Sequence, residues 1–501
     1  MTPSKSKLNT AAENVARLMG PSPIPFVIGG KSLTGSGAET FATRDPGTGE
    51  YLADVCIASP DDVNAAVQDA GRAFRKSGWA TMQPKERLVY LNRLAELVDE
   101  HASELALIES LDTGKPVPQA AWDVANFSQT MRYYSDLAPK IQYRVPIDVA
   151  GNEAWRVRQP AGVCGFIFPW NFPFLLVGWG ISPALAAGNT VVIKPAEDTP
   201  LSTLYLMKLV KQAGIPDGVI NVVTGFGDVT GAALARHPGL ARMSFTGSPE
   251  IGTLVAQACA ANLVPVKLEL GGKGAAVIFE DADVAATAQA LVGAITLNAG
   301  QVCCTASRWL VHKSIYDRFV GEAIGLLRNV RIGYGQDANT QMGPVVSEKQ
   351  RHRILHYIQT GSQTGAEVLL EGGAAEIPGY SDGFYVKPAL LAGNSDNLAC
   401  KEEIFGPVPY VLRFEEEEEA IDKVNESRYG LANSVWTQDA RRADRIAGSL
   451  IAGNSWINAH NVFAHGVPYG GVNLSGYGGG VLGPDALEDY LRKQSVVRPL
   501  A

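Results

Sequence analysis

The feature that most constrains the fold is an alternation of short apolar, strand-like runs with longer segments of helical periodicity. "NTVVIKPAEDTP" begins with a buried strand and leads into "LSTLYLMKLVKQAG", where apolar residues follow helical spacing up to a closing glycine. "GVINVVTG" and "LARMSFTGS" are two further strands, each followed by an Ala-rich helix. Strands that alternate with helices in this way predict βαβ units around a parallel sheet.

The same alternation begins afresh after Gly271. "AAVIFEDAD" predicts a strand and a turn, "VAATAQALVGAITLNAG" a helix, and "SRWLVHKSIYDRFVGEAIGLLRNV" a strand and a helix. A chain of 501 residues is too long for one core and suggests about three domains. We therefore expect a second α/β domain after the first.

A β-hairpin is expected before Pro160. "KIQYRVPIDVAGNEAWRVRQP" alternates polar and apolar residues across a Gly-Asn turn. A hairpin that projects from a domain usually pairs with another chain. We therefore expect a homodimer or a homotetramer.

Composition and charge narrow the class of protein. With 46% hydrophobic and 19% charged residues, the chain has ample apolar side chains for a core. A net charge of −8 disfavours nucleic acid and anionic membranes as partners. The six cysteines show no CxxC spacing, which favours free thiols in a reducing, cytoplasmic compartment. The N-terminal stretch has no apolar core, so no signal peptide is expected.

The uncharged stretch from Gln159 to Ile193 is long enough to suggest a membrane span. Pro169, Pro173 and Pro183 should break any continuous helix there. We therefore interpret it as a buried segment near a functional site.

Two motifs could hold a dinucleotide. "FTGSPEIG" places Gly247 and Gly252 after a strand and at the start of a helix, where backbone N–H groups and the helix dipole can receive a pyrophosphate. "KPAE" lies at the carboxyl end of a strand, where Lys194 could donate to ribose hydroxyls and Glu197 could accept from a 2′-hydroxyl. Taken alone, the glycines of "FTGSPEIG" could be ordinary turn glycines, and "KPAE" could be an ordinary polar turn. The GxGxxG fingerprint of dinucleotide-binding folds is absent.

Three further segments suit acyl chemistry. "FPWNFPF" places Asn171, an amide donor, between prolines; "LELGGKG" places Glu269 at a glycine turn; and "GQVCC" supplies Cys303 and Cys304. A thiol nucleophile, a base and a neutral hydrogen-bond donor are what catalysis through a thioester requires. The adjacent cysteines could instead be a buried apolar pair or a redox couple.

Two other clusters are interpreted as ordinary helix surface. The five glutamates from Glu415 to Glu419 suit a helix N-terminus. His352 and His356 have the i, i+4 spacing of metal ligands, but no third ligand is evident. No metal site is expected.

Six motifs together resemble the NAD(P)-dependent aldehyde dehydrogenase superfamily in their order and spacing: "PWNFP", "KPAE", "FTGS", "ELGGK", "GQVC" and "EEIFGP". The resemblance runs from about Asp45 to the C-terminal strand. It implies a non-acylating dehydrogenase in which the Cys303 thiolate attacks an aldehyde. The Asn171 side chain and the Cys303 N–H would hold the oxyanion, and Glu269 would activate the water that releases the acid.

The resemblance also implies the residues that hold the cofactor. In the family, the residues that match Lys194 and Glu197 hold the adenosine ribose, and the residue that matches Ser248 contacts the pyrophosphate. The residues that match Glu403 and Phe405 position the nicotinamide end. Glu197 favours NAD because a carboxylate would repel a 2′-phosphate, and NADP remains the alternative. The further cofactor-binding positions are Trp170, Gly225, Gly247 and Gly252.

The positions matching the family's substrate tunnel are mainly apolar and aromatic, which favours medium aliphatic or aromatic aldehydes. His460 and His465 lie nearby and could be tunnel contacts or ordinary core and surface residues. The tunnel positions are Phe172, Leu176, Trp179, Val302, Cys304, Asn461, Val462, Phe463 and Tyr469.

The sequence departs from the family at two positions thought to relay protons for the general base. The lysine that many members carry after the oxyanion asparagine falls on Gly180. The arginine and glutamate of the C-terminal run fall on Gly479 and Gly480. Our hypothesis is that Glu269 exchanges protons through water or backbone groups.

The family fold predicts an α/β protein with a Rossmann-like coenzyme domain, an α/β catalytic domain and a small β-hairpin oligomerisation element. We assign residues 1–139 and 160–271 to the NAD-binding domain, 272–472 to the catalytic domain, and 140–159 with 484–501 to the oligomerisation element. The terminal "SVVRPL" is expected to add a strand beside a partner's sheet. The rival functions are a CoA-acylating dehydrogenase, which Glu269 argues against, a non-catalytic relative and a cysteine hydrolase.

Overall fold

Five parallel strands form the middle of an eight-stranded sheet in this computed structural model, which describes residues 10–500. Residues 1–9, part of the stretch used to judge a signal peptide, lie outside the described residues. The antiparallel strands β1 (Phe26–Ile28) and β2 (Lys31–Leu33) extend one edge, and β21 (Gly476–Tyr477) extends the other. In spatial order the parallel strands are β9 (Ile220–Val222), β8 (Thr190–Lys194), β7 (Val163–Ile167), β10 (Arg242–Thr246) and β11 (Val266–Glu269).

The register of these strands creates one edge of the site. Ile167 pairs with Lys194, and Thr246 pairs with Glu269, so the carboxyl ends of four neighbouring strands lie level. The residues that follow β7 and β10 therefore emerge beside Lys194 and Glu269. Ligands bind at this edge in open parallel sheets.

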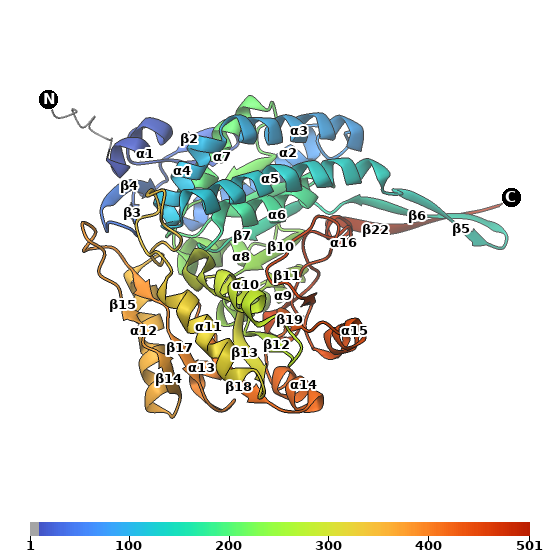
Figure 1. The fold of residues 1–501 in the computed structure, drawn as a ribbon. Coiled ribbons are helices and arrows are strands. Elements are labelled where there is room, and N and C mark those ends of the chain that lie inside the picture. The colour runs from blue at the N-terminus through green and yellow to red at the C-terminus, as the bar shows by residue number, and fades with distance from the viewer. Residues whose placement is uncertain (1–9, 501) are drawn as a thin grey trace.

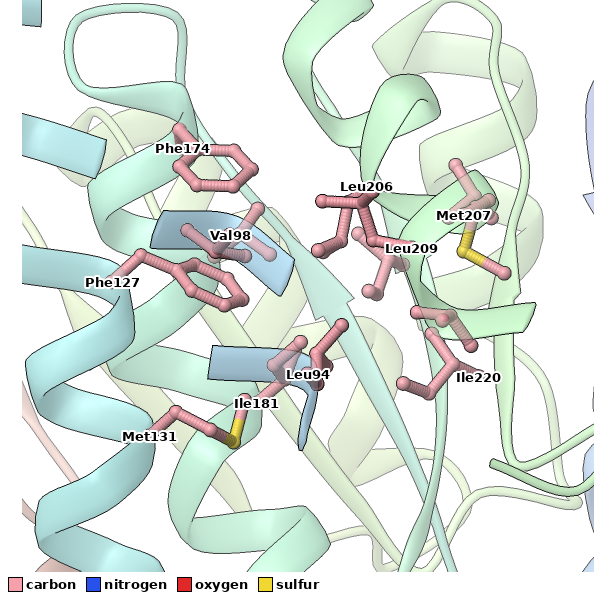
Figure 2. Close-up of a cluster of buried hydrophobic side chains, with 14 of the residues drawn as sticks. Leu94, Val98, Phe127, Met131, Phe174, Ile181, Leu206, Met207, Leu209 and Ile220 are labelled. Atoms are coloured by element: carbon pink, nitrogen blue, oxygen red, sulfur yellow. The ribbon is translucent and has the colours of Figure 1, made fainter. Parts of the chain in front are cut away.

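Helices pack around this sheet and provide most of the first core. In Figure 2, Leu94 and Val98 of the third helix meet Phe127 of the fifth and Leu206 of the seventh. All four side chains are buried, as expected where the apolar faces of helices meet. The helices are α1 (Ala11–Met19), α2 (Pro60–Lys76), α3 (Pro84–Glu100), α4 (Ala102–Thr113), α5 (Val117–Leu137), α6 (Pro173–Ala186), α7 (Leu201–Gln212), α8 (Ala232–Ala235) and α9 (Pro249–Ala260). A small two-stranded sheet, β3 (Thr40–Arg44) with β4 (Tyr51–Cys56), lies at the N-terminal end.

A second sheet of seven strands forms the lower half of the molecule in Figure 1. In spatial order its strands are β14 (Glu367–Leu370), β17 (Leu390–Ala392), β18 (Tyr410–Phe414), β13 (Ala306–His312), β12 (Gly274–Ile278), β19 (Ala432–Trp436) and β20 (Asn454–Ile457). All its neighbours are parallel except β14 with β17, and β15 (Gly373–Ala374) pairs separately with β16 (Val386–Lys387). The helices are α10 (Val284–Thr296), α11 (Tyr316–Arg328), α12 (Glu348–Gln363), α13 (Leu398–Lys401), α14 (Glu417–Asn425) and α15 (Ala440–Ser449). The expected α/β fold is confirmed, and both sheets are mixed, with parallel strands in the middle and antiparallel strands only at edges.

The expected hairpin is present as β5 (Arg144–Val149) and β6 (Asn152–Pro160). Strand β22 (Leu491–Pro499) pairs antiparallel with β6, and the three strands project away from the rest of the molecule in Figure 1. The last strand therefore joins its own chain's hairpin as an edge strand, and its expected position beside a partner's sheet stays a prediction. Full antiparallel register with β6 satisfies its backbone hydrogen bonds within one chain.

The segment just before the last strand packs against the first domain. Helix α16 (Asp485–Glu488) and Tyr490 pack into the core of the larger sheet rather than into the projecting ribbon. The Tyr490 ring lies 5.9 Å from that of Phe166 on β7. Burial of apolar side chains holds this segment against the first domain, and only residues from Leu491 onward enter the ribbon.

The proline-containing stretch folds partly as expected. Pro173 begins α6, but Pro183 lies inside that helix, so the expectation that every proline breaks the helix is wrong at this position. The flanking residues of α6 are buried, and this packing stabilises the helix despite one missing N–H. Among residues 10–500, no helix has the length and apolar character needed to cross a membrane. All six cysteines are free thiols.

Candidate active site

The carboxyl edge of the larger sheet borders a cavity of about 500 Å³. Residues that follow β7 and β10 line it, together with the last residue of β11. The loop before β13 and the segment before β18 close it from the side of the second sheet. The predicted site residues on its lining are Trp170, Asn171, Leu176, Gly247, Ser248, Glu269, Cys303, Glu403 and Phe405.

A second cavity, of about 590 Å³, lies beside the first and has Arg308, Cys400 and Lys423 in its lining. It contains none of the predicted catalytic residues. The Arg308 guanidinium already donates to three backbone carbonyls, so it has little capacity left for a ligand. The first cavity is therefore the candidate active site.

The loop that carries Cys303 has a strained backbone. Asn298 and Ala299 adopt left-handed angles, with φ of 46° and 53°, which cost free energy in residues other than glycine. The buried side chain of Gln301 holds the loop: its Nε2 donates to the Asn298 carbonyl at 2.9 Å, and its Oε1 accepts from Val346 N at 3.0 Å. Strain of this kind gathers at functional sites, where the surroundings hold one conformation.

The two adjacent cysteines have different surroundings. Cys303 is partly exposed and lines the cavity, with its Sγ 3.5 Å from the Tyr469 hydroxyl. Cys304 is 1% exposed, and its Sγ donates to Asn461 Oδ1 at 3.4 Å. The pKa of the Cys303 thiol is raised by its side-chain hydrogen bond with Cys304 and by its burial. Only Cys303 is positioned to meet a ligand in the cavity.

Asn171 is held from both ends. Its side-chain Nδ2 donates to the Gln301 carbonyl at 3.0 Å, which ties it to the cysteine loop. Its backbone carbonyl accepts from Asn298 Nδ2 at 2.8 Å and from Lys115 Nζ at 3.0 Å. An amide carries two N–H donors, so one remains for an oxyanion beside Cys303.

Lys115 belongs to a buried charge cluster that the sequence did not suggest. The Lys115 ammonium contacts Asp123 and lies 3.8 Å from Glu109, and all three side chains are at most 1% exposed. Burial raises the pKa of Asp123 to about 7, although the Lys115 charge lowers it. No local pattern signals this role, because Lys115 is 56 residues from Asn171 in the sequence.

Glu269 ends β11 with its carboxylate inside the protein. The residue is 8% exposed, and neither of its carboxylate oxygens has a hydrogen-bond partner. Burial raises the pKa of Glu269 well above its usual range, the Lys267 charge lowers it, and Cys303 raises it further. An unpartnered carboxylate of raised pKa suits a general base near neutral pH.

The predicted adenosine end lies where β8 ends. Lys194 Nζ donates to Glu197 Oε2 at 2.8 Å, and neither residue lines the 500 Å³ cavity. Burial raises the pKa of Glu197, but Lys194 and backbone hydrogen bonds together lower it more, so the net shift is downward. Gly225 also lies outside the cavity; its φ is 147°, and a Cβ there would lie 2.1 Å from the Thr230 hydroxyl.

The start of α9 has the features of an anion site. Ser248 caps the helix, accepting from Ile251 N at 3.4 Å, and Gly247 precedes it on the cavity lining. A Cβ on Gly247 would lie 2.5 Å from the Phe245 ring, so the backbone approaches closely here. Gly252, one turn into the helix, instead packs on Leu270 and does not line the cavity.

The predicted nicotinamide end is built from two loops. Trp170 and Phe405 meet edge to face with ring centroids 5.3 Å apart, and Phe405 has a positive φ of 62°. Glu403 Oε1 accepts from Gly272 N at 2.9 Å. Burial raises the pKa of Glu403 to about 7.

Aromatic rings surround the approach to Cys303. The Phe463 ring lies 5.5 Å from that of Trp179 and 5.4 Å from that of Tyr469. Trp122 and Trp456, which the sequence analysis missed, also contact Phe463, at 6.4 Å and 6.1 Å. The predicted tunnel residues in this apolar cluster are Phe172, Leu176, Trp179, Val302, Cys304, Phe463 and Tyr469.

The remaining tunnel positions are polar or peripheral. Asn461 contacts the Cys304 thiol, and Val462 is exposed. His460 bridges the Ser434 hydroxyl and the Cys304 carbonyl, and burial lowers its pKa to about 4. His465 contacts the Thr130 hydroxyl instead.

The two glycines that replace the family's relay residues have no room for side chains. A Cβ on Gly180 would lie 2.6 Å from the Phe168 ring. A Cβ on Gly480 would lie 2.3 Å from the Tyr469 carbonyl oxygen. Side chains at either position would therefore require this part of the backbone or core to move.

The other sequence features take no part in the site. The run of glutamates leads into the first turn of α14, and the two histidines at i, i+4 lie on α12. Across the described part of the chain, no cluster of three or more His, Cys, Asp or Glu could hold a metal ion.

Comparison with known proteins gives a consistent result. Residues 33–496 match the model described as Aldehyde dehydrogenase family. A mitochondrial benzaldehyde dehydrogenase of Antirrhinum majus is 40% identical over 479 residues, covering 95% of this chain and 89% of the relative. A phenylacetaldehyde dehydrogenase of Pseudomonas fluorescens is 39% identical over 485 residues, covering 95% and 96%.

A solved structure agrees with the same fold. The NAD+ complex of an aldehyde dehydrogenase from Bacillus cereus superposes with a TM-score of 0.92 and 40% identity, covering 95% of this chain and 96% of that chain. The match spans both α/β units. This chain is therefore a member of the aldehyde dehydrogenase family.

Proposed function

We propose that this enzyme oxidises an aldehyde to the carboxylic acid with NAD, using Cys303, Glu269 and Asn171. One observation carries the proposal: these three residues line a single 500 Å³ cavity together with the predicted pyrophosphate and nicotinamide contacts. A nucleophile, a base and an oxyanion donor around one cavity are what this reaction needs.

The first step is attack of the Cys303 thiolate on the aldehyde carbon, which forms a C–S bond and a thiohemiacetal oxyanion. The free N–H of the Asn171 side chain and the Cys303 backbone N–H hold that oxyanion. The Gln301 and Lys115 contacts keep Asn171 rigid, so little reorganisation is needed as the charge develops. Loss of hydride then leaves a thioester on Cys303.

The second step is hydrolysis of the thioester. Glu269 accepts a proton from water as the water oxygen attacks the acyl carbon, and the C–S bond breaks to release the acid. Because both carboxylate oxygens lack protein partners, either one can bind the water.

NAD supplies the hydride acceptor when it is bound. The residues fit it: Glu197 and Lys194 offer an acceptor and a donor to ribose hydroxyls, and the start of α9 offers N–H groups to a pyrophosphate. The ionised Glu197 carboxylate would repel a 2′-phosphate, which supports NAD over NADP.

The substrate class we propose is an aromatic or medium aliphatic aldehyde. The rings of Phe463, Trp179 and Tyr469 would contact its apolar tail. The Lys115 ammonium lies 4.2 Å from the centroid of the Phe172 ring, but it contacts Asp123 and donates to the Asn171 carbonyl, so it is not free to pair with a second carboxylate. The names of the plant and Pseudomonas relatives, which act on aromatic aldehydes, support the same class.

The test is NADH formation from benzaldehyde, phenylacetaldehyde, hexanal and succinic semialdehyde, for the wild type, Cys303→Ala and Cys304→Ala. We expect turnover of the apolar aldehydes by the wild type and Cys304→Ala, and none by Cys303→Ala. Activity that survives Cys303→Ala would refute the assignment of the nucleophile. Turnover that requires added CoA would instead identify an acylating enzyme.

A further inference from the structure

A buried ammonium group lies beside the general base and has no part in the mechanism above. Lys267 and Glu269 are two residues apart on β11, so their side chains leave the same face of the sheet. Lys267 is 1% exposed. Burying a charged lysine is costly unless it is paired and hydrogen-bonded, so its position needs a reason.

The C-terminal segment supplies both partners of Lys267. Its Nζ donates to the Gly480 carbonyl at 2.7 Å and lies 3.0 Å from Asp489 Oδ2. The Tyr490 ring lies below it, with Nζ 5.2 Å from the ring centroid. Asp489 is 26% exposed, so the pair reaches from the buried base to the protein surface.

The same segment covers Glu269. Gly470 lies against the carboxylate, since a Cβ there would be 3.1 Å from Glu269 Oε1, and it also abuts Gly480. The loops that carry Gly470 and Gly480 therefore enclose Lys267 and Glu269. Gly180 and Gly480 match the relay positions that the family resemblance implies, and both are closed to side chains.

The charged groups facing Glu269 are few. On its own strand there is Lys267, and on the cysteine loop there is Cys303. From β10, Arg242 lies 3.7 Å from Asp489 and shares that carboxylate with Lys267. Among these groups, Lys267 is the cation on the same strand as Glu269, and Asp489 pairs with it.

We propose that Lys267, held by Asp489, is a positioning residue that keeps Glu269 ionised for water activation in a site without the family's relay side chains. The inference rests on the proposed function. Burial raises the pKa of Glu269 and Lys267 opposes that rise, which agrees with the geometry. Burial also lowers the pKa of Lys267, and Asp489 opposes that shift.

The test follows decay of the acylated enzyme against pH after a single turnover, by intact-mass spectrometry of quenched samples, for the wild type and Lys267→Met. Methionine retains the length of the side chain without its charge. We expect the NADH burst to remain and acyl-enzyme decay to slow about tenfold at neutral pH. The pH midpoint should rise by roughly one unit, because an opposite charge nearby shifts a carboxyl by about that much or more. Decay should recover at alkaline pH, which structural damage would not produce.

Three variants sharpen the result. Lys267→Arg keeps the charge and should retain most of the wild-type midpoint. Asp489→Asn, at the exposed end of the pair, should shift the pH midpoint of acyl-enzyme decay in the same direction as Lys267→Met. It replaces Lys267→Met as the test variant where that variant does not fold. Lys208→Met, a partly buried lysine on α7, should leave the midpoint unchanged.

The outcomes separate this inference from the proposed function. A wild type without any NADH burst refutes the function itself. A normal burst with an unchanged midpoint in both Lys267→Met and Asp489→Asn overturns the role of Lys267 and leaves the function intact.

Discussion

At the residue scale, the neighbour of the nucleophile shapes its chemistry. Cys304 is buried, and its thiol donates a hydrogen bond to Asn461. Its side-chain hydrogen bond with Cys303 is the largest cause of the raised pKa of Cys303. The reactive form is the thiolate. The second cysteine therefore disfavours ionisation of the first.

Removing the Cys304 thiol should make Cys303 ionise at lower pH. For Cys304→Ala we expect the pH midpoint of Cys303 alkylation by iodoacetamide, read by peptide mass spectrometry, to fall below that of the wild type. Cys164→Ala, which removes a buried thiol on β7, is the matched control and should not change it. An unchanged midpoint in Cys304→Ala would show that burial alone sets the reactivity of Cys303.

At the element scale, the loop before β13 depends on one glycine for its shape. Gly300 has a φ of 74°, and a Cβ there would lie 2.2 Å from the Gly406 carbonyl carbon. The segment 403–406 carries two of the predicted nicotinamide contacts. The cysteine loop and the cofactor segment are therefore packed backbone to backbone.

Gly300→Ala should disrupt this packing. We expect it to lower the Tm and to reduce activity by more than tenfold, because alanine is strained at positive φ and collides with backbone that cannot move aside. Gly325→Ala in α11, where a Cβ meets nothing within 4 Å, should instead stabilise by about 0.5–1 kcal/mol. Thermal unfolding and steady-state rates measure both, and wild-type behaviour of Gly300→Ala would contradict the close packing.

At the scale of the whole molecule, the projecting ribbon is the candidate contact between chains. Strands β5, β6 and β22 project away from the rest of the chain (Figure 1), and Ile147, Val149 and Val497 are exposed along them. Exposed apolar residues on a long sheet edge are typical of interfaces. We propose that this ribbon, rather than either α/β unit alone, joins subunits into a dimer or tetramer.

Removing the last strand should weaken that assembly. A chain ending at Lys493 lacks most of β22, and we expect its mass by light scattering to fall toward that of one chain. Truncation before Leu500 keeps β22 through Pro499 and should retain the wild-type mass. An oligomer that survives the longer deletion would show that other surfaces hold the subunits together.

Local patterns in the sequence determined the fold class, and the resemblance of six ordered motifs to a family led to the reacting residues that we propose. Apolar runs and their spacing indicated the parallel strands of both sheets, because this signal lies within a few consecutive residues. The motifs around Asn171, Glu269 and Cys303 each lie at the end of a strand or in a loop before one. The strand-end argument placed Lys194 and Glu197 at the ligand-binding edge of the sheet, and the family resemblance joined the other motifs into one predicted site.

Only the tertiary structure decided how those residues are supported and charged. Lys115 holds Asn171 through its backbone carbonyl. Lys267, which we propose acts on Glu269, is held by Asp489, 222 residues away in the sequence. No local pattern encodes either contact. Pro183 inside α6 and the return of β22 to its own hairpin depend on packing in the same way. The ionisation of a buried group depends on burial and on the charges around it in space, and these are set only when the chain has folded.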